Sequence, residues 1–321
     1  MECSDFILLL KNLGVRIVKT KNCILILLAL VLIIGCKNQD APDDTPTTGT
    51  LNIIVDETYK PLIDSEISTF RSIYTYAKVN AKYKTEDQAF TDLMNDSVRL
   101  IVVSRNLNKD EKKQFDKWEI VPKITKIAYD AVAFIGSRDI EDSTYTLSEI
   151  NSLLNVEINK NRLNKIKIVF DNNNSSTLNY LKQKLGIKVF SSNCYALNSN
   201  KAVLDYISKE KNSIGIIGVN WISDQDDTSS VSFLKNVKIL AIAKDESTEP
   251  LKPYQAYIAQ KSYPLYREVY IISKEAYTGL GTGFNAFVAS ERGQRIVLKF
   301  GLVPATMPVR LVEIVNEDLT N

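Results

Sequence analysis

Residues 166–186, IKIVFDNNNSSTLNYLKQKLG, hold the pattern that decides the fold of this chain. Ile168 and Phe170 alternate with other side chains as in a β-strand, whereas the following leucines recur at helical spacing until Gly186 stops the helix. A polar loop therefore joins a strand to a helix.

Three hydroxyl residues, Ser175, Ser176 and Thr177, occupy the start of the predicted helix. The first backbone N–H groups of a helix have no intrahelical partner, and they lie at the positive end of the helix dipole. Such a loop is suited to bind an anion. The same residues could instead serve only as a helix cap, so the site interpretation requires other loops of this kind to face it.

The chain is long enough for two lobes, with 321 residues of which 45% are hydrophobic. Four of its 40 basic residues and two of its 38 acidic residues precede Cys36, so the remainder carries no net charge. This balance argues against a nucleic-acid partner. Histidine is absent, which excludes Ser-His-Asp and Cys-His catalysis and His-ligated metals. We expect neither enzyme activity nor a cofactor.

The N-terminus has the features of a targeting segment. Lys19 and Lys21 precede an apolar run, residues 23–34, of the length found in signal peptides. The run closes with IIGC and resembles the lipobox of bacterial lipoproteins, in which Cys36 would carry the lipid. The alternatives are an ordinary signal peptide or a single anchor helix. Cleavage before Cys36 would leave Cys194 as a lone thiol, which we interpret as a packed small residue.

Residues 36–50 contain Asp, Pro and Thr and few apolar side chains, which predicts a flexible tether. After it, short apolar runs alternate with helical patterns. This alternation predicts an α/β fold with a mostly parallel sheet, whose ligands bind beyond the carboxyl ends of the strands. Thr58, Ser104 and Arg105 follow such strand ends.

Two segments are predicted to connect the lobes. Residues 123–135 form one long strand pattern, interrupted at Tyr129 and Asp130, and residues 244–253 form a charged segment closed by proline. We also expect a strand near Val189. The glycines at 279, 281 and 283 lack the lead-in strand and the acidic residue of a nucleotide site, so we interpret them as a helix lead-in.

Six stretches in this order resemble the phosphate-binding proteins of bacterial ABC importers, the PstS-like branch of the periplasmic binding protein superfamily. They are LNIIVDETYKPLID (51–64), AYDAVAFI (128–135), FDNNNSSTL (170–178), NSIGIIGV (212–219), YPLYREVYI (263–271) and SERGQRIVLKFGLVP (290–304). The resemblance implies two α/β lobes with two crossover strands as a hinge. Expected boundaries are a signal peptide at 1–35, a tether at 36–50, lobe 1 at 51–129 and 253–321, and lobe 2 at 130–252.

The resemblance also implies ligand-binding residues. The family's first loop falls on Glu57, Thr58 and Tyr59, its second on Ser104 with Arg105 beside it, and its Ser-Gly-Thr loop on Ser175, Ser176 and Thr177. Two positions depart from the family pattern. Ser176 replaces a common glycine, and Asp171 replaces the arginine found four residues before the first serine.

Loss of that arginine removes a bidentate partner for an oxyanion. Arg105 is our candidate replacement, although it could equally be a surface residue at a strand end. A carboxylate that accepts the ligand's proton would favour hydrogen phosphate over sulfate. Asp130 and Asp56 are the candidates, and either could be a turn residue instead.

These observations predict a lipid-anchored, extracytoplasmic solute-binding protein that captures phosphate by lobe closure and delivers it to an ABC permease. We expect a monomer in the cell envelope, facing the periplasm or anchored at the outer membrane, that meets the membrane through its lipid. Two alternatives remain open. One is a binder of another oxyanion or a small organic acid, and the other is an envelope lipoprotein with a decayed site that acts as a sensor or assembly partner.

Overall fold

Strands and helices alternate along residues 44–155, 166–223 and 237–308, the parts of the chain that the computed structural model describes. The strands are β1 (Gly49–Asp56), β2 (Ala77–Lys84), β3 (Leu100–Val103), β4 (Lys123–Ser137), β5 (Thr144–Thr146), β6 (Lys167–Phe170), β7 (Cys194–Ala196), β8 (Ser213–Gly218), β9 (Val237–Ile239), β10 (Ala241–Ala243), β11 (Tyr266–Ser273) and β12 (Val303–Pro304).

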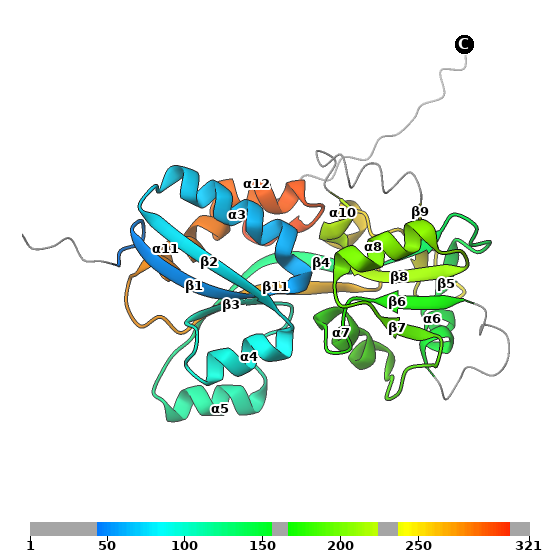
Figure 1. The fold of residues 1–321 in the computed structure, drawn as a ribbon, viewed down its shortest axis with the longest axis horizontal. Coiled ribbons are helices and arrows are strands. Elements are labelled where there is room, and N and C mark those ends of the chain that lie inside the picture. Colours follow the sequence, from blue (N-terminus) through cyan, green and yellow to red (C-terminus); the bar gives the residue numbers. More distant parts are fainter. Residues whose placement is uncertain (1–43, 156–165, 224–236, 309–321) are drawn as a thin grey trace, which may run out of the picture. The chain divides into compact units, whose positions relative to one another are not determined.

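The α-helices are α3 (Lys60–Ile73), α4 (Glu86–Met94), α5 (Lys109–Lys117), α6 (Leu147–Leu154), α7 (Ser176–Leu185), α8 (Asn200–Lys209), α10 (Gln255–Ala259), α11 (Leu280–Ala289) and α12 (Glu291–Lys299). Two short 3-10 helices, η1 (Glu57–Tyr59) and η2 (Val219–Trp221), follow β1 and β8. Figure 1 shows α3 and α12 on one side of β1 and β2, with α4 and α5 on the other. The predicted α/β class is confirmed.

Ten of the described strands form a sheet with the order β2-β1-β3-β11-β4-β8-β6-β7, with β9 and β12 also paired to β4, and β5 and β10 form a separate parallel pair. β1 pairs in parallel with β2 and β3, and β6 pairs in parallel with β7 and β8. The antiparallel pairs gather in the middle, where β11 lies between β3 and β4 and β4 lies beside β8. The carboxyl ends of β1 and β6, which precede two of the predicted site loops, belong to two separate parallel groups.

The long strand β4 joins these two groups because it changes partners along its length. Its first part pairs with β11 and β12 up to Ala131, and from Val132 onward it pairs with β8 and β9. Asp130 lies next to this change of partner. The strand continues through Tyr129 and Asp130, so the interruption expected there is absent.

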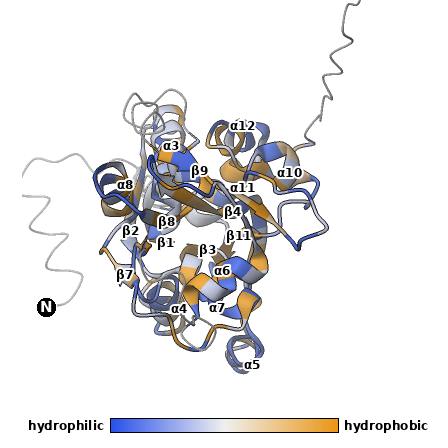
Figure 2. Cartoon of the chain, turned by 90° about the vertical axis from the view of Figure 1, so that its right-hand side faces the viewer, coloured by the Kyte–Doolittle hydropathy of each residue, from blue (hydrophilic) through white to orange (hydrophobic). Residues whose placement is uncertain are grey.

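Apolar side chains fill both faces of the first group of strands. Ile53 and Val55 of β1 belong to the large core under α3, whereas the intervening Ile54 packs with Phe90 and Phe115 under α4 and α5. A strand buried on both faces needs a continuous apolar run, which explains the sequence of β1. Figure 2 shows the same contrast, because β4 is largely apolar and the outer helix α5 is largely polar.

The predicted helix starts are present at α5, α6 and α7. Asn108 with Glu111 and Thr146 with Glu149 form reciprocal capping boxes. Helix α11 starts after Gly279, and the Glu275 carboxylate accepts hydrogen bonds from the amides of Gly281 and Thr282. The chain's own carboxylate therefore occupies this helix N-terminus, which agrees with the helix lead-in that we predicted.

Three expected segments differ in the structure. The predicted tether extends to residue 50, but residues 45–48 form a hydrogen-bonded turn and β1 already begins at Gly49. The strand expected near Val189 lies later, at Cys194–Ala196, and Val189 itself is exposed. The predicted second connection, residues 244–253, forms turns with a single bridge from Leu251 to Ile242 and contains no strand.

No helix within the described ranges is both long and apolar enough to cross a membrane. The apolar run at 23–34 and the candidate lipidation residue Cys36 lie outside these ranges.

Candidate functional site

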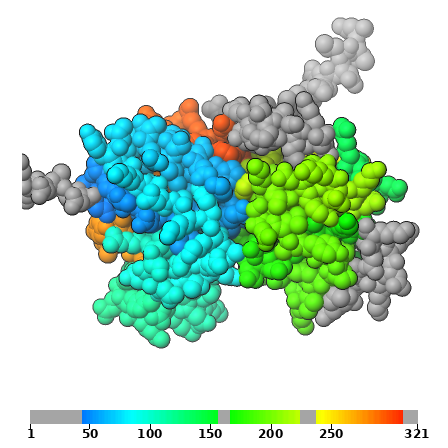
Figure 3. Space-filling model, viewed as in Figure 1, coloured from blue at the N-terminus to red at the C-terminus, as the bar shows by residue number. Residues whose placement is uncertain are grey.

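Three elements that are distant in the sequence, η1, α7 and β11, meet at Ser176. The hydroxyl of Thr58, just after β1, lies 3.2 Å from the Ser176 hydroxyl at the start of α7. Arg267 of β11 donates a hydrogen bond from Nη1 to the same Ser176 oxygen, also at 3.2 Å. All three residues are at most 4% exposed. Figure 3 shows that the blue and cyan residues also touch the green ones at the surface.

We refer to Thr58, Ser176 and Arg267, together with the buried polar residues around them, as the cluster. Its cation is Arg267, which the sequence analysis did not select as a binding residue. Its Nε donates to Oδ2 of Asp130 at 2.8 Å, and Nη2 is equally close to that oxygen without making a hydrogen bond to it. Arg267 and Asp130 face each other in the register of β11 and β4. The sequence does contain a signal for a buried arginine, because Arg267 precedes Val269 and Ile271 at two-residue spacing along β11, and both of these face the core.

The three hydroxyls of the central loop have different roles. Ser175 is the helix cap, and its Oγ accepts a hydrogen bond from the Leu178 amide at 3.3 Å. Ser176 contacts Thr58 and Arg267, whereas the buried Thr177 Oγ1 has no hydrogen-bond partner among the described residues. Ser175 therefore caps the helix. The Ser176 hydroxyl instead faces the cluster, and the Thr177 hydroxyl is buried without a partner among the described residues.

The first loop is held tightly in place. Asp56 accepts a hydrogen bond from the Thr58 amide, and the Thr58 carbonyl accepts hydrogen bonds from Asn220 Nδ2 at 2.9 Å and Trp221 Nε1 at 2.7 Å. A Cβ atom on Gly218 would lie 2.7 Å from the Thr58 methyl group, so only glycine permits this approach of β8.

The residues before and after Thr58 in the sequence are also partly or fully buried. Tyr59 is fully buried, with its ring centre 5.5 Å from the Arg267 guanidinium. Glu57 is partly buried and accepts a hydrogen bond from Asn200 Nδ2 at 2.7 Å. Asn200 also donates to Asp171 at 3.3 Å, which brings the two carboxylates close together. Burial, and then the charge of Asp171, raise the pKa of Glu57.

The second predicted loop lies beside the cluster but is largely paired. Ser104 donates from its amide and its hydroxyl to Glu86, both at 2.7 Å. Arg105 makes a two-pronged ion pair with Glu111, at 2.8 and 2.9 Å, and stacks on Phe90. Its guanidinium is therefore already engaged.

A pocket of about 650 Å³ nevertheless unites both loops, since Ser104, Arg105, Ser176 and Arg267 all line it. A smaller pocket of about 210 Å³ is lined by Asp56, Glu57, Asp171 and Ser175, among others. The structure thus brings residues of all three predicted loops to neighbouring pockets.

Unpaired polar atoms are concentrated in this region. Thirteen buried side-chain nitrogen or oxygen atoms of the described residues lack a hydrogen-bond partner, and eight of them belong to the cluster. These eight are on Asp56, Tyr59, Asp130, Asp171, Thr177, Asn200, Asn220 and Arg267. Native proteins leave few buried polar groups unpaired, so this concentration indicates a place where a ligand completes the hydrogen bonding.

Carboxylates outnumber cations in the cluster. Burial, and then the nearby Glu86, raise the pKa of Asp56 to about 7. Burial also raises the pKa of Asp171. Asp130 is the ion-pair partner of Arg267, and its second carboxylate oxygen is buried and unpaired.

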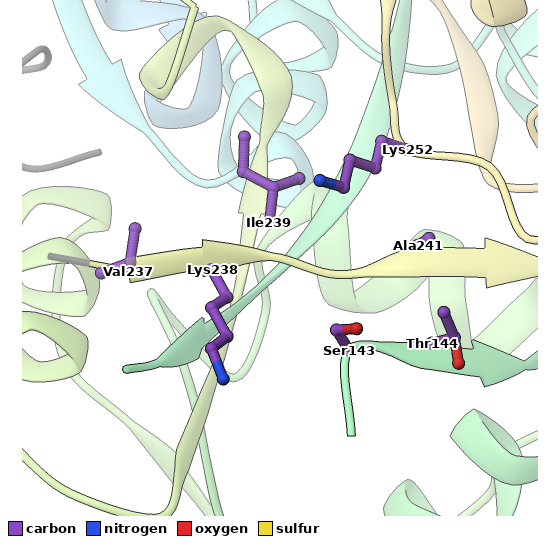
Figure 4. A pocket seen from close by; sticks show the side chains of 7 residues that line it. All are labelled: Ser143, Thr144, Val237, Lys238, Ile239, Ala241 and Lys252. Atoms are coloured by element: carbon purple, nitrogen blue, oxygen red, sulfur yellow. The ribbon is translucent and has the colours of Figure 1, made fainter. Parts of the chain in front are cut away.

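Other chemistry is poorly supported by the described residues. They contain no group of three or more Cys, Asp or Glu side chains arranged to hold a metal. Burial raises the pKa of the free Cys194 thiol to about 12, which makes it a poor nucleophile. A third pocket, of about 430 Å³, lies beside β9 and β10. In Figure 4 its two lysines, Lys238 and Lys252, lie on opposite sides of the strand and do not converge.

Comparisons with known proteins agree with this site and fold. A sequence model described as a PBP superfamily domain matches residues 40–292, so the chain belongs to the PBP superfamily. The phosphate-binding protein PstS of Borreliella burgdorferi is 28% identical over 294 residues, which cover 87% of this chain and 96% of that protein. The expectation of a binding protein, not an enzyme, agrees with that relative.

Two solved structures share the fold. One is a putative phosphate ABC transporter substrate-binding protein from Clostridium perfringens with bound phosphate, with a TM-score of 0.65 and 19% identity, covering 80% of this chain and all of that one. The other is PstS from Borrelia burgdorferi, with a TM-score of 0.51 and 24% identity, covering 79% and 98%. The PstS-like resemblance drawn from the sequence is confirmed.

Proposed function

We propose that this protein is the lipid-anchored, extracytoplasmic binding protein of a phosphate ABC importer. The observation that carries the proposal is the buried convergence of Thr58, Ser176 and Arg267 from three separate elements. Hydroxyls, a guanidinium and the amides of a helix N-terminus are the groups that bind oxyanions. The names of the relatives, which refer to phosphate binding and ABC transport, support the same ligand.

The mechanism is capture between two lobes, residues 51–129 with 253–321 and residues 130–252. The partner change of β4 beside Asp130 supports a hinge at this boundary. Thr58 belongs to the first lobe and Ser176 to the second, so a phosphate that contacts both hydroxyls would link the lobes. A ligand that contacts both sides stabilises the closed form, and the closed monomer is the form presented to the permease.

Hydroxyl substitutions in the central loop test this proposal. Ser176→Ala and Thr177→Ala each remove one hydroxyl that faces the cluster or is unpaired, so phosphate affinity should fall about tenfold or more. Ser175→Ala removes the cap, so it should lower the free energy of unfolding by about 1 kcal/mol. Calorimetric titration with phosphate and urea unfolding measure the two effects.

The comparison of Ser175→Ala with Ser176→Ala provides the control. If Ser175→Ala weakens phosphate binding as strongly as Ser176→Ala while unfolding is unchanged in both, the assigned roles are wrong. If the unsubstituted protein releases no binding heat with phosphate and is not stabilised by it against heating, the function itself is overturned.

Lipid attachment at Cys36 is tested separately. Cys36→Ser should abolish incorporation of labelled fatty acid and shift the protein from the membrane fraction to the soluble one. Cys23→Ser, which lies within the apolar run, is the matched control and should leave both unchanged. Labelling that persists in Cys36→Ser would contradict the anchor.

A further inference from the structure

One edge of the sheet lies at the opposite end of the strands from the cluster. The register of β1 with β2 and β3, and of β11 with β3 and β4, places the starts of β1 to β4 and the end of β11 together. Figure 1 shows the start of β1 and the loop after β11 at the left. We call this region the entry edge, and it consists of residues 44–49, 71–78, 96–100, 116–124 and 273–283.

The segment before β1 is fixed to the entry edge. The Asp44 carboxylate accepts a hydrogen bond from the Leu280 amide at 2.7 Å and another from the Tyr277 hydroxyl. A Cβ atom on Gly283 would lie 1.8 Å from the Pro46 carbonyl oxygen, so only glycine lets α11 pack against this segment. The chain therefore enters the domain at a defined point on this edge.

The length of the preceding chain limits how far the entry edge can lie from the lipid proposed at Cys36. Asp44 comes eight positions after Cys36, and a fully extended chain of that length spans at most about 30 Å. Because Asp44 is bound to α11, this limit applies to the edge itself. The entry edge is thus the part of the domain that the attachment holds near the membrane.

Exposed apolar side chains are concentrated on the entry edge. Nine large apolar side chains of the described residues are exposed, and six of them lie here. They come from the ends of α3 and α5, the starts of β2 and β4, and the loop after β11, and are Ile73, Tyr76, Trp118, Val121, Ile124 and Tyr277. Val121 is 91% exposed and Tyr76 is 79% exposed. Apolar residues gathered in this way mark an interaction surface.

The charges around these side chains indicate which surface is bound. Exposed basic residues outnumber exposed acidic ones on the described entry edge: Arg71, Lys78, Arg99, Lys117 and Lys123 against Asp96, Asp116 and Glu119. Aromatic side chains favour the boundary between water and lipid, and anionic lipid headgroups attract Lys and Arg. Apolar and basic groups on one face are therefore suited to lie on a membrane surface.

We propose that the entry edge rests on the anionic lipid surface in which Cys36 is anchored. This inference rests on the lipid attachment proposed above, since the short chain from Cys36 brings the edge to the membrane. Thr58 and Arg267 lie at the far ends of β1 and β11, so the ligand-binding end faces away from this lipid surface.

The two tryptophans of the chain allow a direct test. Trp118 lies on the entry edge, whereas Trp221 donates a hydrogen bond to the Thr58 carbonyl beside the cluster. Lipidated protein is reconstituted on phosphatidylglycerol vesicles whose acyl chains carry bromine, which quenches tryptophan at short range. Trp221→Phe leaves Trp118 alone, and its fluorescence should fall. Trp118→Phe leaves Trp221 alone, and its fluorescence should stay the same.

Charged substitutions test the surface in the Trp221→Phe background. Tyr76→Glu combined with Val121→Glu should remove most of the quenching of Trp118, because the added carboxylates are repelled by anionic lipid and the apolar contact is lost. Val189→Glu combined with Tyr195→Glu changes two exposed apolar side chains outside the entry edge and should leave the quenching as it was. Urea unfolding verifies that each variant is folded.

The possible failures are distinguishable. Equal quenching of both tryptophans, or of neither, in protein that carries labelled fatty acid would overturn the membrane contact and leave the lipid anchor standing. A dimer that Val121→Glu dissociates in sedimentation, without quenching of Trp118, would assign the entry edge to a second copy and also overturn the contact. Absence of labelled fatty acid would overturn the anchor and this inference together, while phosphate titration tests the binding function independently.

Discussion

Arg267→Gln is expected to abolish phosphate binding and to destabilise the fold. The substitution removes the cation that contacts Ser176 and leaves Asp130 as a buried carboxylate without its ion-pair partner. Removing one partner of a buried pair costs about 3–5 kcal/mol in the free energy of unfolding. Loss of a desolvated charged hydrogen bond to the ligand should lower affinity by at least about a hundredfold.

Pairing this change with Asp130→Asn separates binding from folding. The double variant has no unpaired buried charge, so most of the lost stability should return while phosphate binding remains absent. Arg105→Gln is the matched control, since that guanidinium is engaged with Glu111, and phosphate binding should fall far less. Recovery of phosphate affinity in the double variant, or an equal loss in Arg105→Gln, would refute the assignment of Arg267 as the binding cation. Titration calorimetry and urea unfolding provide both readouts.

Glu66→Gln is expected to stabilise the protein in a pH-dependent way. Glu66 lies on the apolar face of α3 with Ile63 and Phe70, is fully buried, and has no hydrogen-bond partner for either carboxylate oxygen among the described residues. Burial raises the pKa of Glu66 to about 9. The folded protein therefore holds a proton that the unfolded chain releases, so stability falls as the pH rises between the unfolded and folded pKa values.

The glutamine variant removes this penalty because it has no proton to hold. Near pH 8 it should increase the free energy of unfolding by roughly 2–4 kcal/mol, and near pH 5 by less than about 1 kcal/mol. Urea unfolding at both pH values measures the difference, with the exposed Glu249→Gln as the control. A stabilisation that is the same at both pH values would show that Glu66 does not carry this titration.

Local elements of this protein are readable from its sequence. Asn108 with Glu111 marks a helix start, Gly186 marks a helix end in the left-handed conformation, and Ser175 caps α7 as expected. These features depend on hydrogen bonds and backbone angles within a few residues. The strand of β4 is likewise recognisable from its long apolar run, although its change of partner is not.

The residues of the candidate site were likewise only partly predictable from local sequence patterns. Thr58 and Ser176 were selected because loops at the ends of strands can be located from local patterns. Arg267 was passed over for Arg105, which follows the apolar strand of residues 100–103 and Ser104. Which arginine meets the central loop depends on how β11 registers against β4, and that register places Arg267 opposite Asp130.

The sequence alone thus determined the alternation of strands and helices, their caps and the three loops that could bind an anion, because these are set by short-range patterns. The tertiary structure decided which cation joins them and that acidic groups lie beside the site. These facts arise from contacts between residues far apart in the sequence, such as Arg267 with Ser176, and no local pattern encodes such contacts.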